Sequence, residues 1–232
     1  MLAFLSSDTP KNIISALEEK GARVIPLPPF SALQAPVASH TDMLLLAYGE
    51  TLFIHKDYAF SSNEALLDAF DKVITLDEPI SSKYPNDILL NIAIVGDNVF
   101  ANTKFASKIA LDFLSGQGKK ICHVNQGYAH CSICTVSDNA IITSDVGIAD
   151  TAKSVGIDTL LISSGHISLP GYDYGFIGGA SGTDKDNVYF CGSLSYHPDG
   201  TSIKSFCQKH GKTVVELSDS PLVDIGGILL VE

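Results

Sequence analysis

Residues 87–101 read DILLNIAIVGDNVFA and hold, in order, a polar residue, an apolar strand, a tight Gly-Asp-Asn turn and a second apolar strand. The same arrangement recurs along the chain, with polar openers at Asp42, Asp87, His130, Asp173 and Asp224. The steps between them are 45, 43, 43 and 51 residues. A fixed period of this size indicates a supersecondary unit that cannot bury its apolar face alone. Five such units account for the whole length, so the sequence predicts one domain over residues 1–232.

Each repeat is expected to fold as strand, turn, strand, helix, strand (ββαβ), since the turns carry the Gly, Asp or Asn that hairpins require. The second hairpin strands are predicted at Leu52–His55, Val99–Ala101, Ala140–Thr143 and Val188–Cys191. The fifth repeat lacks a second hairpin strand. We expect Leu2–Leu5 to supply it and to close the ring of five units.

Helices are predicted from apolar periodicity and from glycine stops after each helix. The first is expected to have Thr9 as its N-cap and Pro10 at its first position, and to end at Gly21. The others are predicted at Asn63–Phe70, Lys104–Leu114, Ile148–Val155 and Ser202–His210, the last three ending at Gly116, Gly156 and Gly211. A strand follows each helix, at Arg23–Leu27, Lys72–Leu76, Lys120–Val124, Thr159–Ser163 and Thr213–Leu217. The expected fold class is α/β, a five-bladed, pseudo-fivefold α/β-propeller.

The composition argues against two classes of binding partner, nucleic acids and membranes. The net charge is −11 and no basic cluster occurs, so binding to nucleic acid through phosphates is not expected. No run of 18 or more apolar residues is present, so no membrane partner is expected either. The five cysteines show no framework spacing, which is typical of a reducing cytoplasm. The oligomeric state stays open.

Openers at equivalent positions of a ring should converge on its axis, which would then carry Asp42, Asp87, His130, Asp173 and Asp224, with Asn91 and His166 nearby. Four carboxylates around one cavity repel one another, so either a pKa is raised or a cation lies between them. A guanidinium group fits well because its planar fork matches carboxylates. Two alternatives stay open: a metal ion with oxygen ligands, and openers that only cap strands and turns.

The ring of five ββαβ units resembles the pentein fold of the guanidino-group-modifying enzymes, which include dimethylarginine dimethylaminohydrolase, arginine deiminase and amidinotransferases. Residues 85–90 (PNDILL) are similar to the family's G-G-D-V-L-F segment, and the resemblance implies a catalytic acid at Asp87. Residues 165–168 (GHIS), followed by Asp173, are similar to its H-L-x-S segment and imply a catalytic His166. Asp42, Asn91, His130, Asp173 and Asp224 are then expected to bind substrate.

One departure concerns the nucleophile. The family places a cysteine after a glycine-containing segment of the last strand, whereas this chain has Leu229 and Leu230 there. Without a thiolate no covalent amidino intermediate forms by the usual route. Cys131 and Cys134, in another repeat, are the candidates for a relocated nucleophile, although core thiols are the simpler interpretation.

The functional hypothesis is therefore a central acidic pocket for a cationic small molecule of guanidino type, with altered or lost hydrolase or amidinotransferase chemistry on C–N bonds. No cofactor and no resident metal are expected. Two alternatives stay open. One is a non-catalytic binding module that acts through its outer surface, similar to the family's ribosome anti-association factor. The other is a purely hydrolytic site that uses an activated water with a carboxylate as base.

Overall fold

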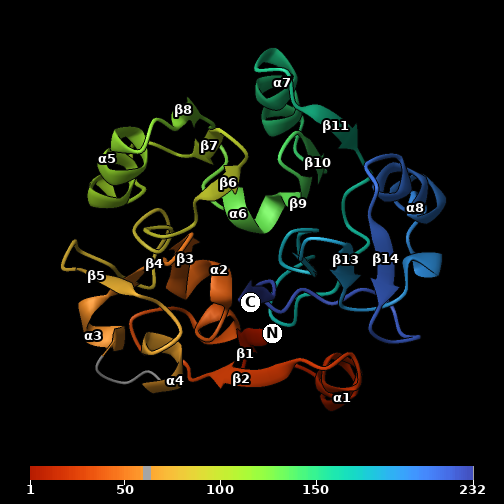
Figure 1. Cartoon of the computed structure of the whole chain (residues 1–232), viewed down its shortest axis with the longest axis horizontal. Helices are drawn as coiled ribbons and strands as arrows, with labels where there is room; N and C mark the ends of the chain where they lie inside the picture. Colours follow the sequence, from red (N-terminus) through yellow and green to blue (C-terminus); the bar gives the residue numbers. More distant parts are fainter. Residues whose placement is uncertain (60–63, 232) are drawn as a thin grey trace.

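A computed structural model describes residues 1–59 and 64–231. Within these residues the strands form five three-stranded sheets, with orders β15-β1-β2, β3-β4-β5, β6-β7-β8, β9-β10-β11 and β12-β13-β14. In every sheet the middle strand pairs antiparallel with one neighbour and parallel with the other. Figure 1 shows the five units arranged around the middle of the molecule, with both chain ends near the centre. The predicted α/β fold of ββαβ units is confirmed.

The strands of the first three sheets are β1 (Leu2–Ser6), β2 (Arg23–Leu27), β3 (Leu45–Tyr48), β4 (Thr51–His55), β5 (Lys72–Leu76), β6 (Ala93–Val95), β7 (Asn98–Ala101) and β8 (Lys120–His123). The others are β9 (Cys134–Ser137), β10 (Ala140–Thr143), β11 (Asp158–Leu161), β12 (Ser181–Thr183), β13 (Asn187–Phe190), β14 (Thr213–Glu216) and β15 (Leu229–Val231). The predicted second hairpin strands and the strands after the helices agree with these within two residues at each end.

The helices are α1 (Lys11–Glu19), α2 (Thr41–Leu44), α3 (Lys56–Ala59), α4 (Glu64–Leu67), α5 (Lys108–Gly116), α6 (Ala129–Ser132), α7 (Val146–Ser154) and α8 (Gly200–Lys209), with short 3-10 turns at Ala35–Val37 and Leu194–Tyr196. The predicted helix over 63–70 is observed only as the single turn α4, which ends at Leu67. The first residue of the prediction, Asn63, lies outside the described residues.

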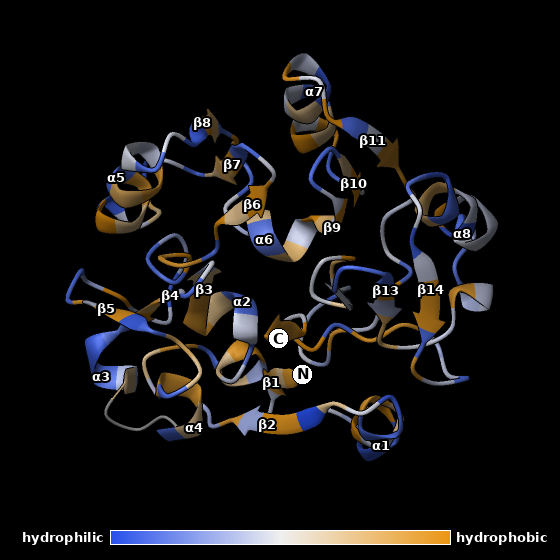
Figure 2. Ribbon diagram, in the orientation of Figure 1, coloured by the Kyte–Doolittle hydropathy of each residue, from blue (hydrophilic) through white to orange (hydrophobic). Residues whose placement is uncertain are grey.

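The N-terminal strand completes the last unit, as predicted. β1 runs antiparallel to β15, with Leu2 opposite Val231 and Phe4 opposite Leu229. This pairing joins the two ends of the chain in one sheet, and β2 then adds in parallel on the other side of β1. Apolar residues concentrate there, since the ribbon of β1 and of the C-terminal strand is orange in Figure 2 whereas peripheral α3 is largely blue.

Three local predictions were wrong. Thr9 is not the N-cap of α1, because its hydroxyl donates to the Ser6 carbonyl at 2.7 Å and Pro10 takes the cap position ahead of Lys11. Gly116 does not stop α5, whereas Gly118 has the left-handed φ of +81° that an L side chain rarely adopts.

The third correction concerns the polar openers, which lie three to eight residues before their strands rather than at the strand starts. Asp42 and His130 lie in the single helical turns α2 and α6, in which part of the backbone bonds locally, as the Leu44 N–H does to the His40 carbonyl at 3.2 Å. The N–H groups of Asp42 and His130 donate instead to distant segments of the chain, at Gly226 and Asn91. These bonds satisfy the buried backbone without a neighbouring strand.

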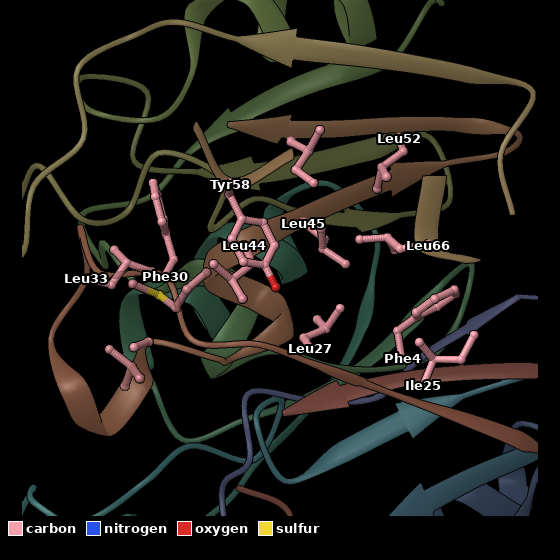
Figure 3. Packing of buried hydrophobic residues seen from close by; sticks show 14 of the residues in the cluster. Phe4, Ile25, Leu27, Phe30, Leu33, Leu44, Leu45, Leu52, Tyr58 and Leu66 are labelled. Atoms are coloured by element: carbon pink, nitrogen blue, oxygen red, sulfur yellow. The ribbon is translucent and has the colours of Figure 1, made fainter. Parts of the chain in front are cut away.

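Buried apolar side chains fill the space between neighbouring units. Figure 3 shows the largest such cluster, in which Phe4 and Ile25 of β1 and β2 pack with Leu45, Leu52 and Tyr58 of the next unit. Fully burying a side chain of this size contributes roughly 1.5–3 kcal/mol. These clusters fix the positions of α2 and α6, which carry the candidate functional groups.

Candidate functional site

A buried asparagine joins α2 to α6. Asn91 is fully buried, and its Oδ1 accepts the N–H groups of His130 at 2.7 Å and Cys131 at 3.3 Å. Its Nδ2 donates to the Asp42 carbonyl at 3.2 Å and lies 2.9 Å from the Cys131 Sγ. The amide therefore uses both ends, and it fixes the backbone of one short helix against the other.

A second connection runs from α2 to the segment before β15. The N–H of Asp42 donates to the Gly226 carbonyl at 3.0 Å. Gly226 has φ +79°, and a Cβ built on it would lie 2.3 Å from the Cβ of His40. Only glycine permits this backbone approach. As a result Asp42 and Asp224 lie close to each other although they are far apart in the chain.

Asp42 and Asp224 are both buried, at 2% and 4% exposure. Burial, and secondly the charge of Asp224, raise the pKa of Asp42 well above its usual range, and the adjacent Cys131 thiol offsets part of this. Neither Asp42 carboxylate oxygen has a hydrogen-bond partner of normal geometry among the described residues. Burial raises the pKa of Asp224 to about 6, although the N–H groups of Phe176 and Gly226 donate to its carboxylate at 2.8 and 2.9 Å.

Tyr128 connects Asp87 to the pair formed by Asp42 and Asp224. Its Oδ2 accepts the Tyr128 hydroxyl at 2.7 Å, and its Oδ1 has no hydrogen-bond partner among the described residues. Burial raises the pKa of Asp87, and burial together with the Asp87 contact raises the pKa of Tyr128. Tyr128 also packs against Phe176, with ring centroids 6.3 Å apart.

A cavity of about 220 Å³ opens beside these groups, and we call it the acidic cavity. Its polar wall contains His40, Cys131, Asp173 and Asp224. The rest of the wall is apolar or aromatic, from Val37, Met43, Tyr128, Leu169, Tyr172, Tyr174 and Phe176. His40 Nδ1 lies 3.8 Å from an Asp224 oxygen, and burial lowers the pKa of His40 to about 4, so this imidazole is neutral near pH 7. The cavity therefore carries negative charge without a cationic side chain among its described lining residues.

The two candidate thiols occupy different environments. Cys131 lines the acidic cavity, and burial followed by the charges of Asp42 and Asp224 raises its pKa well above the usual value. Cys134 is buried in an apolar cluster with Val136 and Ile177, and burial raises its pKa to about 12. Both thiols are therefore protonated near neutral pH, and Cys131 alone of the pair faces the cavity.

The two histidines that the sequence singled out lie away from the acidic cavity. His166 is exposed, and its ring contacts His197 with centroids 5.4 Å apart. His130 contributes its backbone N–H to Asn91, and the residue lines two other cavities and not the acidic one. Asp87 reaches the acidic cavity through Tyr128 without itself lining it. The structure thus brings together Asp42, Asn91 and Asp224. Of these only Asp224 lines the acidic cavity, together with exposed Asp173. The roles predicted for all these residues stay predictions.

Sequence reasoning missed His40 and Tyr128. Each lies two residues before an opener, at Asp42 and His130, so a search at that offset in every repeat could have found them. No such signal identified Phe176, which contributes to the aromatic side of the acidic cavity. It follows its opener Asp173 instead of preceding it, and its position at the cavity depends on the tertiary fold. No group of three or more His, Cys, Asp or Glu side chains is placed to hold a metal ion within residues 1–59 and 64–231.

A family model described as "Family of unknown function (DUF6873)" matches residues 4–229 of the chain. No curated protein matches the sequence. None of the helices in the described part of the chain is long and apolar enough to cross a membrane.

Solved structures with the same fold have low sequence identity. A Cys-to-Ser mutant of the dimethylarginine dimethylaminohydrolase of Pseudomonas aeruginosa, complexed with citrulline, has a TM-score of 0.61 at 10% identity, over 94% of this chain and 91% of that one. SxtG, an amidinotransferase of the saxitoxin biosynthetic pathway from Microseira wollei, has a TM-score of 0.57 at 12% identity, over 100% and 94%. An agmatine deiminase of C. jejuni has a TM-score of 0.52 at 10% identity, over 95% and 90%. The chain has the pentein fold.

Proposed function

The chain belongs to the DUF6873 family, and we propose that it binds a small cationic molecule of guanidino type in the acidic cavity. The observation that carries the proposal is Asp224, a buried carboxylate in the wall of the acidic cavity. The carboxylate of Asp42, which does not itself line the cavity and has no hydrogen-bond partner of normal geometry among the described residues, lies close to it. Ionising such a pair in a dry interior is costly unless an opposite charge lies nearby. A bound cation supplies that charge for both carboxylates.

The chemistry of the wall favours a delocalised cation. A guanidinium group donates in a planar fork that matches carboxylate oxygens, and it is less strongly hydrated than an ammonium group. The rings of Tyr128, Tyr172 and Phe176 line the same cavity, and aromatic faces attract cations. The volume of about 220 Å³ suits a small head group. An amidinotransferase and an agmatine deiminase share this fold.

A second candidate function, cleavage of a guanidino C–N bond, is favoured by the position of Cys131 at the cavity wall. Against it, Cys131 is protonated at rest because burial and two carboxylates raise its pKa, and a thiol is a poor nucleophile. Leu229 lies in β15, paired with Phe4, where the family resemblance implies a cysteine. Binding without a covalent thiol intermediate is therefore the primary proposal.

The test is a thermal-shift titration with arginine and with citrulline, in which an uncharged ureido group replaces the guanidinium. Arginine should stabilise the protein and citrulline should not. Asp224→Asn removes one charge-assisted contact, worth roughly 1.5–3 kcal/mol, so affinity should fall roughly ten- to a hundredfold. Asp219→Asn, at an exposed acid outside the cavity lining, is the matched control and should respond as wild type does.

Two further measurements separate the alternatives. Because the pKa of Asp224 is about 6, arginine affinity should rise between pH 5 and pH 7.5 as this carboxyl ionises. Intact-mass measurement after incubation with arginine should show no adduct, and an adduct lost in Cys131→Ser would establish the catalytic candidate instead. Equal stabilisation by citrulline, or an Asp224→Asn variant that responds like wild type, would refute the cation site and favour a binding module that acts through its outer surface.

A further inference from the structure

The wall of the acidic cavity carries carboxylates at two depths. Asp224 is buried, whereas Asp173, which stands between Tyr172 and Tyr174 in the chain, is exposed. Tyr172 and Tyr174 also line the cavity, and they are 40% and 42% exposed. These three consecutive residues therefore form an outer edge of the cavity, and we call residues 172–174 the rim.

The rim lies close to the buried carboxylate. The Phe176 N–H donates to Asp224 at 2.8 Å, and a Cβ built on Gly175 would lie 2.4 Å from the Asp224 Cβ. Asp173 precedes Gly175 by two residues, which span at most roughly 7 Å of backbone. The two carboxylates of the wall are therefore within reach of the two ends of one short alkyl chain.

Contacts with the rest of the protein hold the rim in place. The Tyr172 hydroxyl donates to Gln34 Oε1 at 3.1 Å. The Tyr174 ring packs edge-on against Phe176, with centroids 6.1 Å apart. The Asp173 side chain itself makes no hydrogen bond or ion pair with any residue of the described part of the chain, so its carboxylate is available to a ligand.

His40 is a neutral polar group on the same wall that also lacks a hydrogen bond. It is 5% exposed, and its ring makes no hydrogen bond within residues 1–59 and 64–231, although its Nδ1 lies 3.8 Å from an Asp224 oxygen. Burial lowers the pKa of His40 to about 4, so near pH 7 the ring offers one N–H and one lone pair without a positive charge. A buried imidazole left unpaired is unfavourable, and its lone pair can accept an N–H of a cation held at Asp224.

The cavity offers no cationic side chain to a carboxylate. Neither lysine nor arginine is found among its described lining residues. Arginine is the residue whose planar fork matches a carboxylate, and the chain has a single arginine, Arg23, which begins β2 and does not line the cavity. A ligand carboxylate at the rim would instead meet the like charge of Asp173, which repels it.

We propose that the ligand of the acidic cavity is a guanidino alkylamine, which carries a second cationic group at the end of a short alkyl chain and no carboxylate. This inference rests on the proposed function, because it keeps the guanidinium group at Asp224 and adds an ammonium group at Asp173. The exposed rings of Tyr172 and Tyr174 attract the same ammonium group. The apolar side chains of the wall pack against the alkyl chain.

The test is isothermal titration calorimetry with probes that share one guanidinium head and differ at the far end. Butylguanidine has no charge there, agmatine has an ammonium group, δ-guanidinovaleric acid has a carboxylate, and arginine has both. Agmatine should bind roughly two- to fivefold more tightly than butylguanidine, the range expected for one exposed ion pair. Arginine should bind about as well as butylguanidine, and δ-guanidinovaleric acid should bind most weakly. Added salt should reduce the advantage of agmatine, because it screens exposed charges.

Asp173→Asn should bring the affinity for agmatine down to that for butylguanidine, and it should leave the affinity for butylguanidine unchanged. Asp219→Asn is the matched control, since it removes the same charge from an exposed position outside the cavity lining. It should keep the wild-type order of the probes. Asp224→Asn should weaken all of the probes roughly ten- to a hundredfold, because every one of them has the guanidinium group.

These variants distinguish failure of this inference from failure of the proposed function. If Asp224→Asn weakens butylguanidine but agmatine binds no more tightly than butylguanidine, the inference is wrong and the cation site stands. The same holds if arginine or δ-guanidinovaleric acid binds most tightly, or if the advantage of agmatine persists in Asp173→Asn. Binding of none of the probes, or an Asp224→Asn variant that binds butylguanidine as wild type does, would refute the proposed function and this inference with it.

Discussion

Asp224→Asn offers the sharpest test of the buried acidic pair through stability. Asp224 is 4% exposed, and its pKa is raised from 3.8 to about 6, first by burial. One pKa unit corresponds to about 1.4 kcal/mol, so ionised Asp224 costs the folded state about 3 kcal/mol. The folded pKa lies above the unfolded one, so the folded state binds more protons between the two values. Wild-type stability should therefore decline as pH rises, beginning near pH 4 and completing above about pH 6.

The assay is urea denaturation of wild type and Asp224→Asn at intervals between pH 4 and pH 8. Relative to wild type, the unfolding free energy of Asp224→Asn should increase by about 3 kcal/mol across this range. The gain is reduced because the new amide accepts the N–H groups of Phe176 and Gly226 less strongly than the carboxylate does. The variant should also lower the pKa of Asp42, because the charge of Asp224 is one of the groups that raise it.

Asp158→Asn is the control of opposite sign. Hydrogen bonds from Lys209 and His210 lower the pKa of Asp158 on the surface, so its stabilising contribution is present above its ordinary pKa and is lost as pH falls. Parallel pH profiles for wild type and Asp224→Asn would refute the account of a desolvated carboxylate pair. They would mean that Asp224 is effectively hydrated or neutralised within the protein.

Two further predictions concern the neighbours of this pair. Tyr128→Phe removes the 2.7 Å hydrogen bond to Asp87 and should lower the unfolding free energy at pH 7 by about 1.5–3 kcal/mol, measured by chemical denaturation; an unchanged value would mean that the hydroxyl and Asp87 are separated in solution. Cys131 should react with iodoacetamide far more slowly than free cysteine at pH 8, because its pKa is raised. Asp42→Asn should accelerate this reaction, as followed in a mass-spectrometric time course. A rapid reaction of the wild-type thiol would contradict the raised pKa.

The local elements could be predicted from the sequence because they depend on nearby residues. Alternating apolar strands around Gly-Asp-Asn turns fix hairpins such as β6–β7, since the turn sets the register. The recurrence of that pattern gave five units, and the missing fifth hairpin strand predicted the β1–β15 pairing. The end of α5 was predicted wrongly because two glycines, Gly116 and Gly118, follow the apolar face, and only the backbone distinguishes them, with φ +81° at Gly118.

The amino-acid sequence by itself determined the repeat, the five-unit fold and the acidic character of the openers. Only the tertiary structure decided which openers meet, because each lies in a turn or loop whose direction depends on packing against other units. The β1–β15 pairing and the bond from Asp42 to Gly226 bring Asp42 to Asp224, whereas His166 lies exposed beside His197. The placement of Cys131 at a cavity and of Cys134 in the core is likewise tertiary, because α6 ends between them and the chain changes direction there.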